Sequence, residues 1–361
     1  MYHTLKSAIF LLLFFVVNVA SAQSNLLKAK DLGRQAVALE DQGRFMEALN
    51  LLADAQKLDP ASAIYPYEMA YCYYSTKDYQ RAIEILLKLK SYKDVFARVY
   101  QLLGNSYDDT GMKDKAIETY EAGLKLFPDA GELYLESAVI RIGKQDFVKA
   151  LDFCEQGIKA DPAFASNYYW ASRIYCATSE TVWGLIYGEI FMNLERSGKR
   201  RDEISKLLFD TYKTSITIGD GGKVRVDFSK RDTINVDPKE DISKFKMPFN
   251  LAYGLPVLMN VGAPKTIDLE SLNNIRTGFI RSYHKMGYDK LYPNALFNYQ
   301  DEIIKAGHFE AYNHWLLMKG DEAGFSTWYK ANKPKWDAFY AWYNANPIKI
   351  NRDNRFYRGQ Y

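Results

Sequence analysis

The residues best suited to metal chemistry lie near the end of the chain, where His308 and His314 flank Glu310. The two histidines are six residues apart, which places them on opposite sides of a helix. Zinc-protease motifs instead hold two histidines four residues apart, with a glutamate beside the first. Glu310 and His314 would share one helix face. Three ligands at a suitable spacing are not visible, so the sequence predicts no metal site.

Motifs for other catalytic chemistry are also missing. The sequence has no Gly-x-Ser-x-Gly elbow, and the glycine-rich run at 219–222 lacks the Lys-Ser/Thr pair of a phosphate loop. Adjacent acids such as Asp108 and Asp109 are typical of a solvated helix surface. The two carboxylates of a glycosidase need not be neighbours in the sequence, so a glycoside hydrolase stays open as an alternative. We predict no catalytic residue, no cofactor and no enzyme activity.

The chain has three cysteines, Cys72, Cys154 and Cys176. An odd number cannot be fully paired within one chain. Two of them, Cys72 and Cys154, fall within predicted helices. Free cysteines behave as small apolar residues, so we expect buried thiols rather than a disulfide.

The elements that would position these residues are indicated by an alanine that recurs every 34 residues without insertion. It occurs as Ala48, Ala82, Ala116 and Ala150. Twelve residues after three of these alanines stands a proline, and Asp94 takes that place in the remaining unit. The prolines are Pro60, Pro128 and Pro162. A fixed period of this length predicts an array of helical units, each of which needs its neighbours to bury its apolar face.

Other positions of the unit recur in the same phase when the alanine is numbered 20. Small residues at positions 8 and 20 would let two helices approach closely, and bulky residues at positions 4, 11 and 24 would fill the space between them. Position 8 holds Ala36, Ala70, Gly104 and Ala138, and position 24 holds Leu52, Leu86, Tyr120 and Cys154. The turn between the helices is predicted near Gly43, Lys77, Gly111 and Gln145.

This pattern resembles the tetratricopeptide repeat, a helix–turn–helix unit. Four units agree in phase, over residues 29–62, 63–96, 97–130 and 131–164, and a fifth over 165–197 is degenerate. In the fifth unit the proline is missing, although positions 4, 8, 11 and 20 are kept by Tyr168, Ser172, Tyr175 and Gly184. The resemblance implies an all-α, right-handed superhelical solenoid whose end unit departs from the pattern because it caps the stack.

The resemblance also implies a concave groove, lined by positions 2, 5, 9, 12 and 13 of the first helix of each unit. In the first two units these positions include Lys30, Gly33, Val37 and Ile64. Tyrosines in unit two and polar groups in unit three suit contact with a peptide or protein. Packing of these tyrosines against a neighbouring helix is the alternative. We predict that a partner contacts Tyr67, Tyr71, Tyr74, Arg98, Gln101, Asn105, Asp108, Leu135, Tyr169 and Arg173.

Residues 1–22 are predicted to be a signal peptide. Lys6 precedes an apolar run over 8–17 that is too short to span a bilayer, and Ala20-Ser21-Ala22 fits the cleavage pattern. We therefore expect a periplasmic or secreted protein that begins at Gln23, with an uncleaved membrane anchor as the alternative. No later stretch is long and apolar enough for a transmembrane helix. With 47 basic and 44 acidic residues, the charge gives no case for nucleic acid.

The pattern changes after the repeats. Residues 198–217 predict an amphipathic capping helix, and residues 218–247 predict a linker with a short β hairpin whose strands lie near Val224 and at 233–236. Residues 248–361 predict a helical C-terminal domain without the 34-residue period, with divergent repeat hairpins as the alternative. Its expected helices run from an Asp268 N-cap to Lys285, from Pro293 to Gly307, and over 308–319, 322–331 and 334–345.

This last region is rich in aromatic residues, among them Trp315, Trp328, Trp336 and Trp342. One interpretation is an aromatic core, because Trp336, Phe339, Tyr340 and Tyr343 recur at three- and four-residue steps. The other is a cleft whose rings stack on sugars or peptide side chains. The spacing does not decide between them.

The sequence therefore predicts an exported protein–protein interaction scaffold or adaptor: a tetratricopeptide-like solenoid, a small β insert and a helical C-terminal domain. The alternative function is a cell-envelope glycan-binding protein or hydrolase that uses the C-terminal domain. That alternative requires a deep cleft with a tryptophan and two carboxylates, and burial of all four C-terminal tryptophans would exclude it. A third arrangement, in which the C-terminal region is only a long cap on one continuous solenoid, also stays open.

Overall fold

The computed structural model describes residues 23–219, 223–229, 247–262 and 264–361. The predicted signal peptide and the predicted strand at 233–236 lie outside these residues. The chain divides into two compact units, Met1–Pro128 and Asp129–Tyr361. Within the described residues, no helix combines the length and the apolar character needed to cross a membrane.

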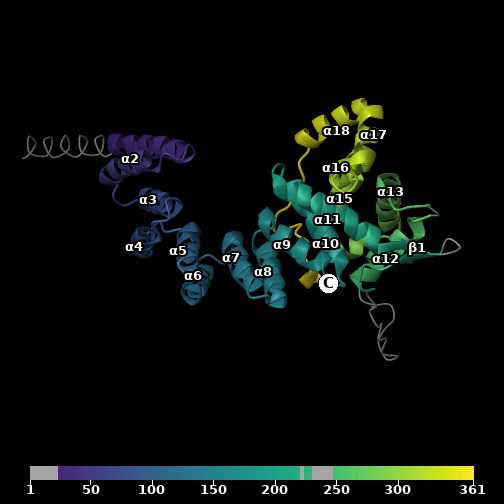
Figure 1. Ribbon diagram of the computed structural model, residues 1–361, viewed down its shortest axis with the longest axis horizontal. Coiled ribbons are helices and arrows are strands. Elements are labelled where there is room, and N and C mark those ends of the chain that lie inside the picture. Colours follow the sequence, from purple (N-terminus) through teal and green to yellow (C-terminus); the bar gives the residue numbers. More distant parts are fainter. Residues whose placement is uncertain (1–22, 220–222, 230–246, 263) are drawn as a thin grey trace, which may run out of the picture. The chain divides into compact units, whose positions relative to one another are not determined.

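The first unit is built from helix pairs, as the period predicts (Figure 1). A helix over residues 23–40 shares an apolar core with α2 (Phe45–Leu58). The next pairs are α3 (Ile64–Ser75) with α4 (Tyr79–Leu89) and α5 (Ala97–Asp109) with α6 (Lys113–Leu126). Helices α2 and α6 end before Pro60 and Pro128, because proline cannot continue a helix. Where Asp94 replaces the proline, its carboxylate accepts a hydrogen bond from the backbone N–H of Ala63 at 3.0 Å.

The turn inside each of the first four helix pairs uses one left-handed residue at the same repeat position. The φ angles are 74° at Gly43, 64° at Lys77, 81° at Gly111 and 58° at Gln145. The residue after each one donates its N–H back into the preceding helix, as Asp78 does to the carbonyl of Tyr73 at 2.8 Å. The turn positions predicted from the sequence are therefore confirmed. Two of them are filled by residues with a Cβ, which the left-handed conformation disfavours.

Small residues at positions 8 and 20 place the paired helices in close contact. All four recurring alanines are fully buried. The tightest approach in the first unit is at Gly104 in α5, where a Cβ would lie 2.1 Å from Cε1 of Tyr120 in α6. The hydroxyl of Tyr120 donates to Oδ1 of Asn105 at 2.5 Å, which holds the ring in place. Positions 8 and 24 thus meet as the repeat pattern predicts.

The second unit begins with two more helix pairs. They are α7 (Gly131–Gly143) with α8 (Phe147–Ala160), and α9 (Ala165–Cys176) with α10 (Thr181–Leu194). The degenerate fifth pair keeps the close contact at position 20, because a Cβ on Gly184 would lie 2.5 Å from Sγ of Cys176. The helix α11 (Lys199–Ser215) follows and packs against α9 and α10.

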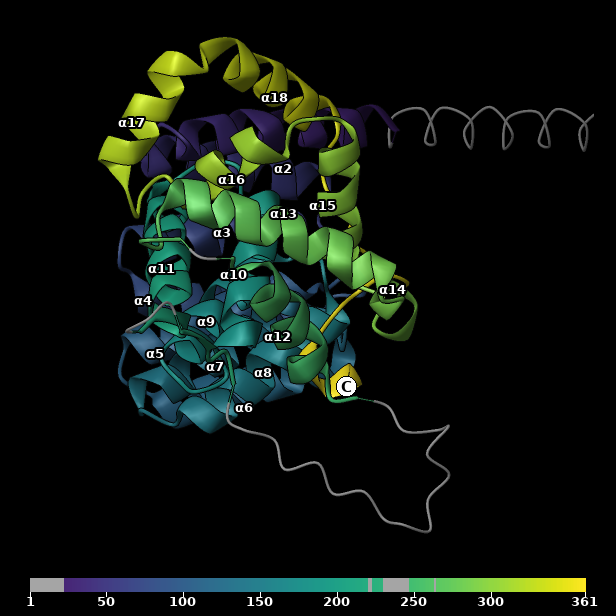
Figure 2. The same cartoon turned by 90° about the vertical axis from the view of Figure 1, so that its right-hand side faces the viewer.

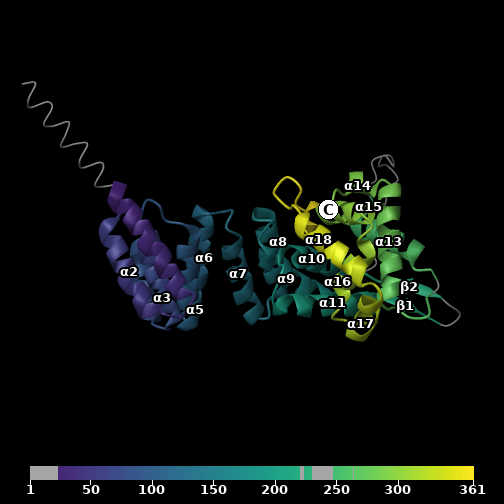
Figure 3. The ribbon, with the colours of Figure 1, turned by 90° about the horizontal axis from the view of Figure 1, so that it is seen from above.

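A short antiparallel strand pair comes next, with β1 (Ile216–Ile218) opposite β2 (Val224–Val226). Figure 3 shows the two strands beside each other. The strand that pairs with β2 is thus β1, which precedes the glycine-rich turn. Strand β1 starts at Ile216, where the sequence predicted the end of the capping helix. Backbone pairing of Ile216 with Val226 competes there with one more turn of helix.

The remaining elements of the second unit, within the described residues, are helices. They are α12 (Phe249–Asn260), α13 (Leu269–Lys285), α14 (Tyr288–Leu291), α15 (Ala295–Lys305), α16 (Phe309–Leu317), α17 (Glu322–Ala331) and α18 (Lys333–Ala345), followed by the short 3-10 helix η3 (Arg358–Gln360). Asp268 caps α13 as predicted, in a capping box with Ser271. Helix α15 begins at Ala295 rather than at Pro293, because the side chain of Asn294 accepts from the N–H groups of the first turn.

Helix α10 lies at the centre of the second unit, and every residue from Val182 to Asn193 is buried. One apolar core contains residues of α8 to α10 together with α12, α13, α15, α16 and α18. In Figure 2, α13 crosses between α12 and α16, and it packs against both. The compact units divide before the fourth repeat, and repeat five and the C-terminal helices share this core.

The C-terminal tail is an ordered strap rather than a frayed end. Phe356 is buried and stacks on Trp183 with ring centroids 5.6 Å apart. The N–H of Arg358 donates to the hydroxyl of Tyr187 at 2.8 Å, and Arg352 forms an ion pair with Asp129 at 2.9 Å. These contacts fix the tail against helix α10 and against Asp129, which lies just before α7.

Candidate functional site

An apolar hollow of about 650 Å³ lies between the helix at 23–40 and α3 in the first unit. Its walls include Val37 and Ile64, both half-exposed, and the ring of Tyr65. Lys30, Gly33, Val37 and Ile64 all line it. They occupy repeat positions 2, 5 and 9, the positions that face the groove in the family. The hollow therefore lies where the resemblance places a partner.

Charged groups stand at the edge of this hollow. Lys30 and Arg34 come from the first helix and Glu68 from α3. Burial raises the pKa of Glu68, against an opposing effect of the Arg98 guanidinium. The hollow thus offers apolar walls with both a cationic and an anionic contact at its edge, which suits an amphipathic polypeptide segment.

A buried carboxyl group, Glu40, lies on the neighbouring part of the first helix. It accepts a hydrogen bond from Sγ of Cys72 at 3.3 Å. Burial, with a further contribution from the charge of Glu68, raises the pKa of Glu40 to about 7. All three cysteines are free thiols. Cys72 and Cys154 are buried, and Cys176 is half-buried.

The predicted aromatic ladder of unit two is only partly available to a partner. Tyr67 is buried, packs edge-on against Phe96 at 4.9 Å, and has the guanidinium of Arg98 over its ring at 5.2 Å. Tyr71 is 37 % exposed and keeps an accessible ring. Tyr74 is half-buried, and its hydroxyl donates to Asp109 at 2.6 Å. The packing alternative thus describes Tyr67, whereas Tyr71 remains a surface residue.

The predicted polar positions of unit three lie on α5. Arg98 is exposed, and Gln101, Asn105 and Asp108 are half-buried. Asn105 is already engaged as the acceptor for Tyr120. Oδ1 of Asp108 is buried and has no hydrogen-bond partner in the described part of the chain, and such an atom calls for a donor.

The remaining predicted residues belong to the second unit. Leu135 on α7 is half-buried. The hydroxyl of Tyr169 donates to Glu203 of α11 at 2.7 Å, and Arg173 pairs with the same carboxylate at 2.9 Å. The guanidinium of Arg200 also lies over the Tyr169 ring. Helix α11 therefore covers Tyr169, which is buried, and holds Arg173 in an intramolecular contact.

The C-terminal tryptophans serve mainly in packing, but only Trp315 is buried. Trp328, Trp336 and Trp342 are half-buried and pack against the core. Of the predicted stripe, Phe339 and Tyr343 are buried, Trp336 is half-buried, and Tyr340 is exposed. Among the described residues, no three His, Cys, Asp or Glu side chains come together as metal ligands.

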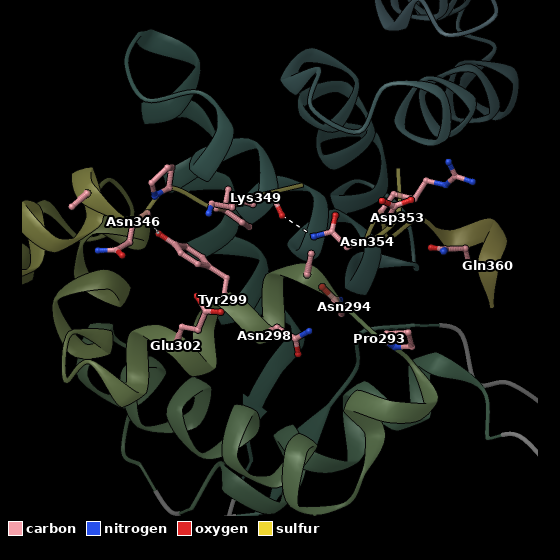
Figure 4. Close-up of a pocket in the computed structure, with 15 residues that line it drawn as sticks. Pro293, Asn294, Asn298, Tyr299, Glu302, Asn346, Lys349, Asp353, Asn354 and Gln360 are labelled. Atoms are coloured by element: carbon pink, nitrogen blue, oxygen red, sulfur yellow. Dashed lines mark hydrogen bonds between the residues drawn. The ribbon is translucent and has the colours of Figure 1, made fainter. Parts of the chain in front are cut away.

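A polar hollow of about 520 Å³ lies where the tail passes the start of α15 (Figure 4). Carboxamides line much of it: Asn294, Asn298, Asn346, Asn354 and Gln360. Several polar groups are used within the fold, since Tyr299 donates to the carbonyl of Asn346 and Asn354 donates to that of Lys349, both at 2.8 Å. The polar side chains around this hollow thus help to hold the C-terminal tail in place.

The contacts predicted from the sequence centre on the tyrosines of unit two and the polar residues of unit three. The open hollow is formed instead by Val37 and Ile64, with charged residues at repeat position 6, Arg34 and Glu68. The groove positions of the first unit already contained Lys30, Gly33 and Val37, but nothing in the sequence showed that Tyr67 would be buried by Phe96.

A family model described as a tetratricopeptide repeat matches residues 34–94, and a second model with the same description matches residues 97–129. No curated protein sequence matches the chain.

Among solved structures, PilF of Pseudomonas aeruginosa is 14 % identical, with a TM-score of 0.45, and the match covers 53 % of this chain and 86 % of that one. TTC0263, a thermophilic TPR protein of Thermus thermophilus, is 16 % identical with a TM-score of 0.42, over 50 % of this chain and 98 % of that one. MamA of Desulfovibrio magneticus is 18 % identical with a TM-score of 0.36, over 48 % and 97 %.

The two family matches cover the first three of the four units in which the 34-residue period was found. Within them, the helix pairs, the left-handed turn residues and the buried alanines recur in one phase. Residues 34–94 and 97–129 of the chain are therefore tetratricopeptide repeats.

Proposed function

We propose that this protein is an exported scaffold that holds a segment of a partner protein in the apolar hollow of its first unit. Tetratricopeptide repeats support a role in protein–protein interaction, and the specific site and compartment are our proposal. The observation that carries it is the coincidence of the hollow with groove positions 2, 5 and 9 of the first two repeats. Val37 and Ile64 would receive apolar side chains of the partner.

The charged edge of the hollow supports the same proposal. Lys30 and Arg34 on one side and Glu68 on the other would fix the direction of an amphipathic segment. Exposed apolar side chains that surround a concave site are typical of protein-binding surfaces. Tyr71 and the unpaired buried oxygen of Asp108 would extend the contact along α3 and α5.

The proposed compartment rests on the signal-peptide pattern of residues 1–22. If the leader is removed after Ala22, the intact mass of protein purified from its native cells corresponds to a chain that begins at Gln23. A purified chain that retains residues 1–22 would contradict export by this route.

The glycan alternative is not favoured by the side chains that it would use. The cleft that contains Trp328 also contains Glu310, but Glu310 is paired with Lys335 at 2.9 Å. Burial raises the pKa of Glu310, and hydrogen bonds from Lys335 and Trp328 outweigh that effect and leave the pKa below its usual value. A glycosidase acid needs a raised pKa. His314 stacks on the indole of Trp328 with centroids 4.0 Å apart, which covers a face that a sugar would need.

Site-specific photo-crosslinking in the native cells tests the scaffold. A crosslinking residue at position 37 or 64 should capture one dominant polypeptide. The matched control is position 46, because Met46 is a strongly exposed apolar residue on α2 that does not line the hollow. Equal capture from all three positions would show that the contacts are nonspecific.

A charge placed in the hollow gives an independent test. Val37→Asp should lower capture from position 64 by about tenfold or more, because a carboxylate there would be desolvated by the partner's apolar side chain. Val37 is half-exposed, so helical content should not change. Unchanged capture with a folded variant would refute this assignment of the site.

A further inference from the structure

A cleft of about 680 Å³ lies in the second unit, between the start of α13, helix α16 and helix α17. Acidic and amide side chains line it, together with one histidine and one tryptophan. The residues that matter are Glu270, Asn273, Glu310, His314, Asp321 and Trp328. This cleft is separate from the hollow of the first unit and takes no part in the proposed function.

The imidazole of His314 is held in a single orientation. The residue is 4 % exposed, and its Nδ1 lies 2.9 Å from the backbone carbonyl oxygen of Glu310. A carbonyl oxygen can only accept, so Nδ1 carries the hydrogen and the neutral ring has its lone pair on Nε2. Burial lowers the pKa of His314, although Glu310 and Glu270 act to raise it. His314 is therefore a neutral acceptor, and no partner for its Nε2 exists within the described residues.

Most carboxylates around the cleft are already used by the fold. Asp268 accepts from the N–H of Ser271, and Asp321 accepts from the N–H of Gly324, both at 2.9 Å. Glu310 accepts from the indole Nε1 of Trp328 at 2.8 Å and from Lys335. Glu270 is exposed, and its carboxylate has no ion-pair or hydrogen-bond partner in the part of the chain that the structure describes. Of the carboxylates and the histidine that line the cleft, the groups left over are thus two acceptors, the Glu270 carboxylate and Nε2 of His314.

The charges around the cleft also favour a ligand that donates hydrogen bonds to these two acceptors. Asp268, Glu270, Glu310 and Asp321 all line the cleft, and Lys335 is the cation paired with one of them. A negatively charged cleft with two free acceptors favours a cationic ligand that can donate several hydrogen bonds. A guanidinium or an ammonium group on a flexible stem has this chemistry. The cleft is large enough for such a side chain and the backbone on either side of it.

We infer that this cleft binds the cationic head of an arginine or lysine side chain that a partner polypeptide presents. The head donates to the carboxylate of Glu270 and to Nε2 of His314, and the aliphatic stem lies along the walls of the cleft. The second unit thus binds a basic side chain of the partner, independently of the segment that the first unit holds.

The test uses the mature chain with ¹⁵N-labelled histidine, in which the Nε2 resonance of His314 is assigned from His284→Gln and His308→Gln variants. The probe is N-acetyl-arginine methylamide. Its uncharged analogue of the same shape, N-acetyl-citrulline methylamide, is the control ligand. We expect the arginine probe to shift the Nε2 resonance saturably and the citrulline analogue to bind at least tenfold more weakly.

Two acidic variants separate a specific contact from general attraction. Glu270→Gln should weaken arginine binding at least fivefold. Glu322→Gln should not change it, because Glu322 is exposed on α17 and pairs with Lys319 outside the cleft. His314→Phe keeps a ring to stack on Trp328 and removes the lone pair, so it should abolish binding. If that variant misfolds, the comparison of Glu270→Gln with Glu322→Gln still tests whether arginine binding depends on the cleft.

Three outcomes would overturn the inference: an Nε2 resonance that does not move, equal binding of the citrulline analogue, or unaltered binding by Glu270→Gln. Agmatine distinguishes the source of the ligand, because it carries the guanidinium without a peptide backbone. Binding of agmatine without binding of the blocked arginine would assign the cleft to a small amine and overturn the polypeptide assignment.

Discussion

The guanidinium of Arg276 in α13 donates to the carboxylate of Glu189 in α10 at 2.6 Å, and the two side chains are only 5 % and 4 % exposed. Tyr312 of α16 also donates to this carboxylate at 2.8 Å, and Gln300 of α15 is a further donor. Arg276 in turn donates to Asn313 at 2.6 Å. This buried network ties the second helix of repeat five to three C-terminal helices.

Breaking this pair from one side should destabilise the second unit strongly. Arg276→Met leaves the Glu189 carboxylate buried without its counter-charge, at an expected cost of about 3–5 kcal/mol. Chemical denaturation followed by circular dichroism measures the loss. Glu189→Met with Arg276→Met should lose clearly less than the sum of the two single changes, because no unpaired charge remains.

The surface pair Lys206 and Asp210 on α11 gives the control for that experiment, since both side chains are exposed. Neutralising it should leave the unfolding midpoint almost unchanged. Strictly additive losses for Arg276 and Glu189 would mean that their contact does not couple repeat five to the C-terminal helices.

A methyl group at Gly104 should destabilise the first unit. The Cβ of Gly104→Ala would lie 2.1 Å from the ring of Tyr120, which is buried and hydrogen-bonded to Asn105 and cannot move away. Overpacking of this kind costs roughly 1–3 kcal/mol and exceeds the helix-propensity gain of alanine. Gly143→Ala is the matched change, because nothing lies within 4 Å of its Cβ position. A Gly104→Ala variant as stable as the wild type would show that α5 and α6 separate easily.

Lys77→Gly should raise stability, because residue 77 has a φ of 64°, a conformation that disfavours a Cβ. The expected gain is roughly 0.5–1 kcal/mol in the free energy of unfolding. The reverse change at the equivalent turn, Gly111→Ala, should lose about as much, since its φ is 81°. Thermal unfolding of both variants measures the pair. Shifts of the same sign would contradict this account of the turn.

Glu40 should make the first unit less stable as the pH rises. Its pKa of about 7 in the folded protein lies above the ordinary carboxyl value, so the folded state binds the proton more tightly. The associated stability is present below the unfolded pKa, near 4.5, and is lost as the pH rises through 7. We expect a loss on the order of 1–3 kcal/mol between pH 4.5 and pH 8.

Glu40→Gln should remove most of that pH dependence and be more stable than the wild type at pH 8. Glu47→Gln is the control, because Glu47 is exposed and paired with Arg44. An unaltered pH profile in the Glu40 variant would place the titrating group elsewhere, with Glu68 as the next residue to test, since burial also raises its pKa.

The periodic part of the fold could be predicted because each repeat position has one physical task. The left-handed turn at Gly43 and the helix stop before Pro60 depend on residues close in sequence. Even Gln145, which is neither glycine nor asparagine, could be placed in the turn by its phase alone, and the structure gives it a φ of 58°.

The packing of the second unit could not be predicted in the same way. Glu189 and Gln300 are 111 residues apart, and no period links them. The polar residues of α10 would be expected at its surface, yet Glu189 and Asn193 are buried. The burial of Tyr67 could not be predicted for a related reason, because it depends on Phe96, and Phe96 lies outside the groove positions. The predicted contacts at Tyr71, Arg98 and Asp108 remain predictions.

Helix α10 is the second helix of repeat five, yet it has no solvent-facing side between Val182 and Asn193. A protein fragment cut after residue 197 would carry all five repeats, yet it would expose the residues of α10 that α13, α15 and α16 cover. A truncated or grafted version of this array should therefore be cut between Pro128 and Asp129, where the two compact units divide. The smallest piece that can carry the last two repeats is the whole of residues 129–361.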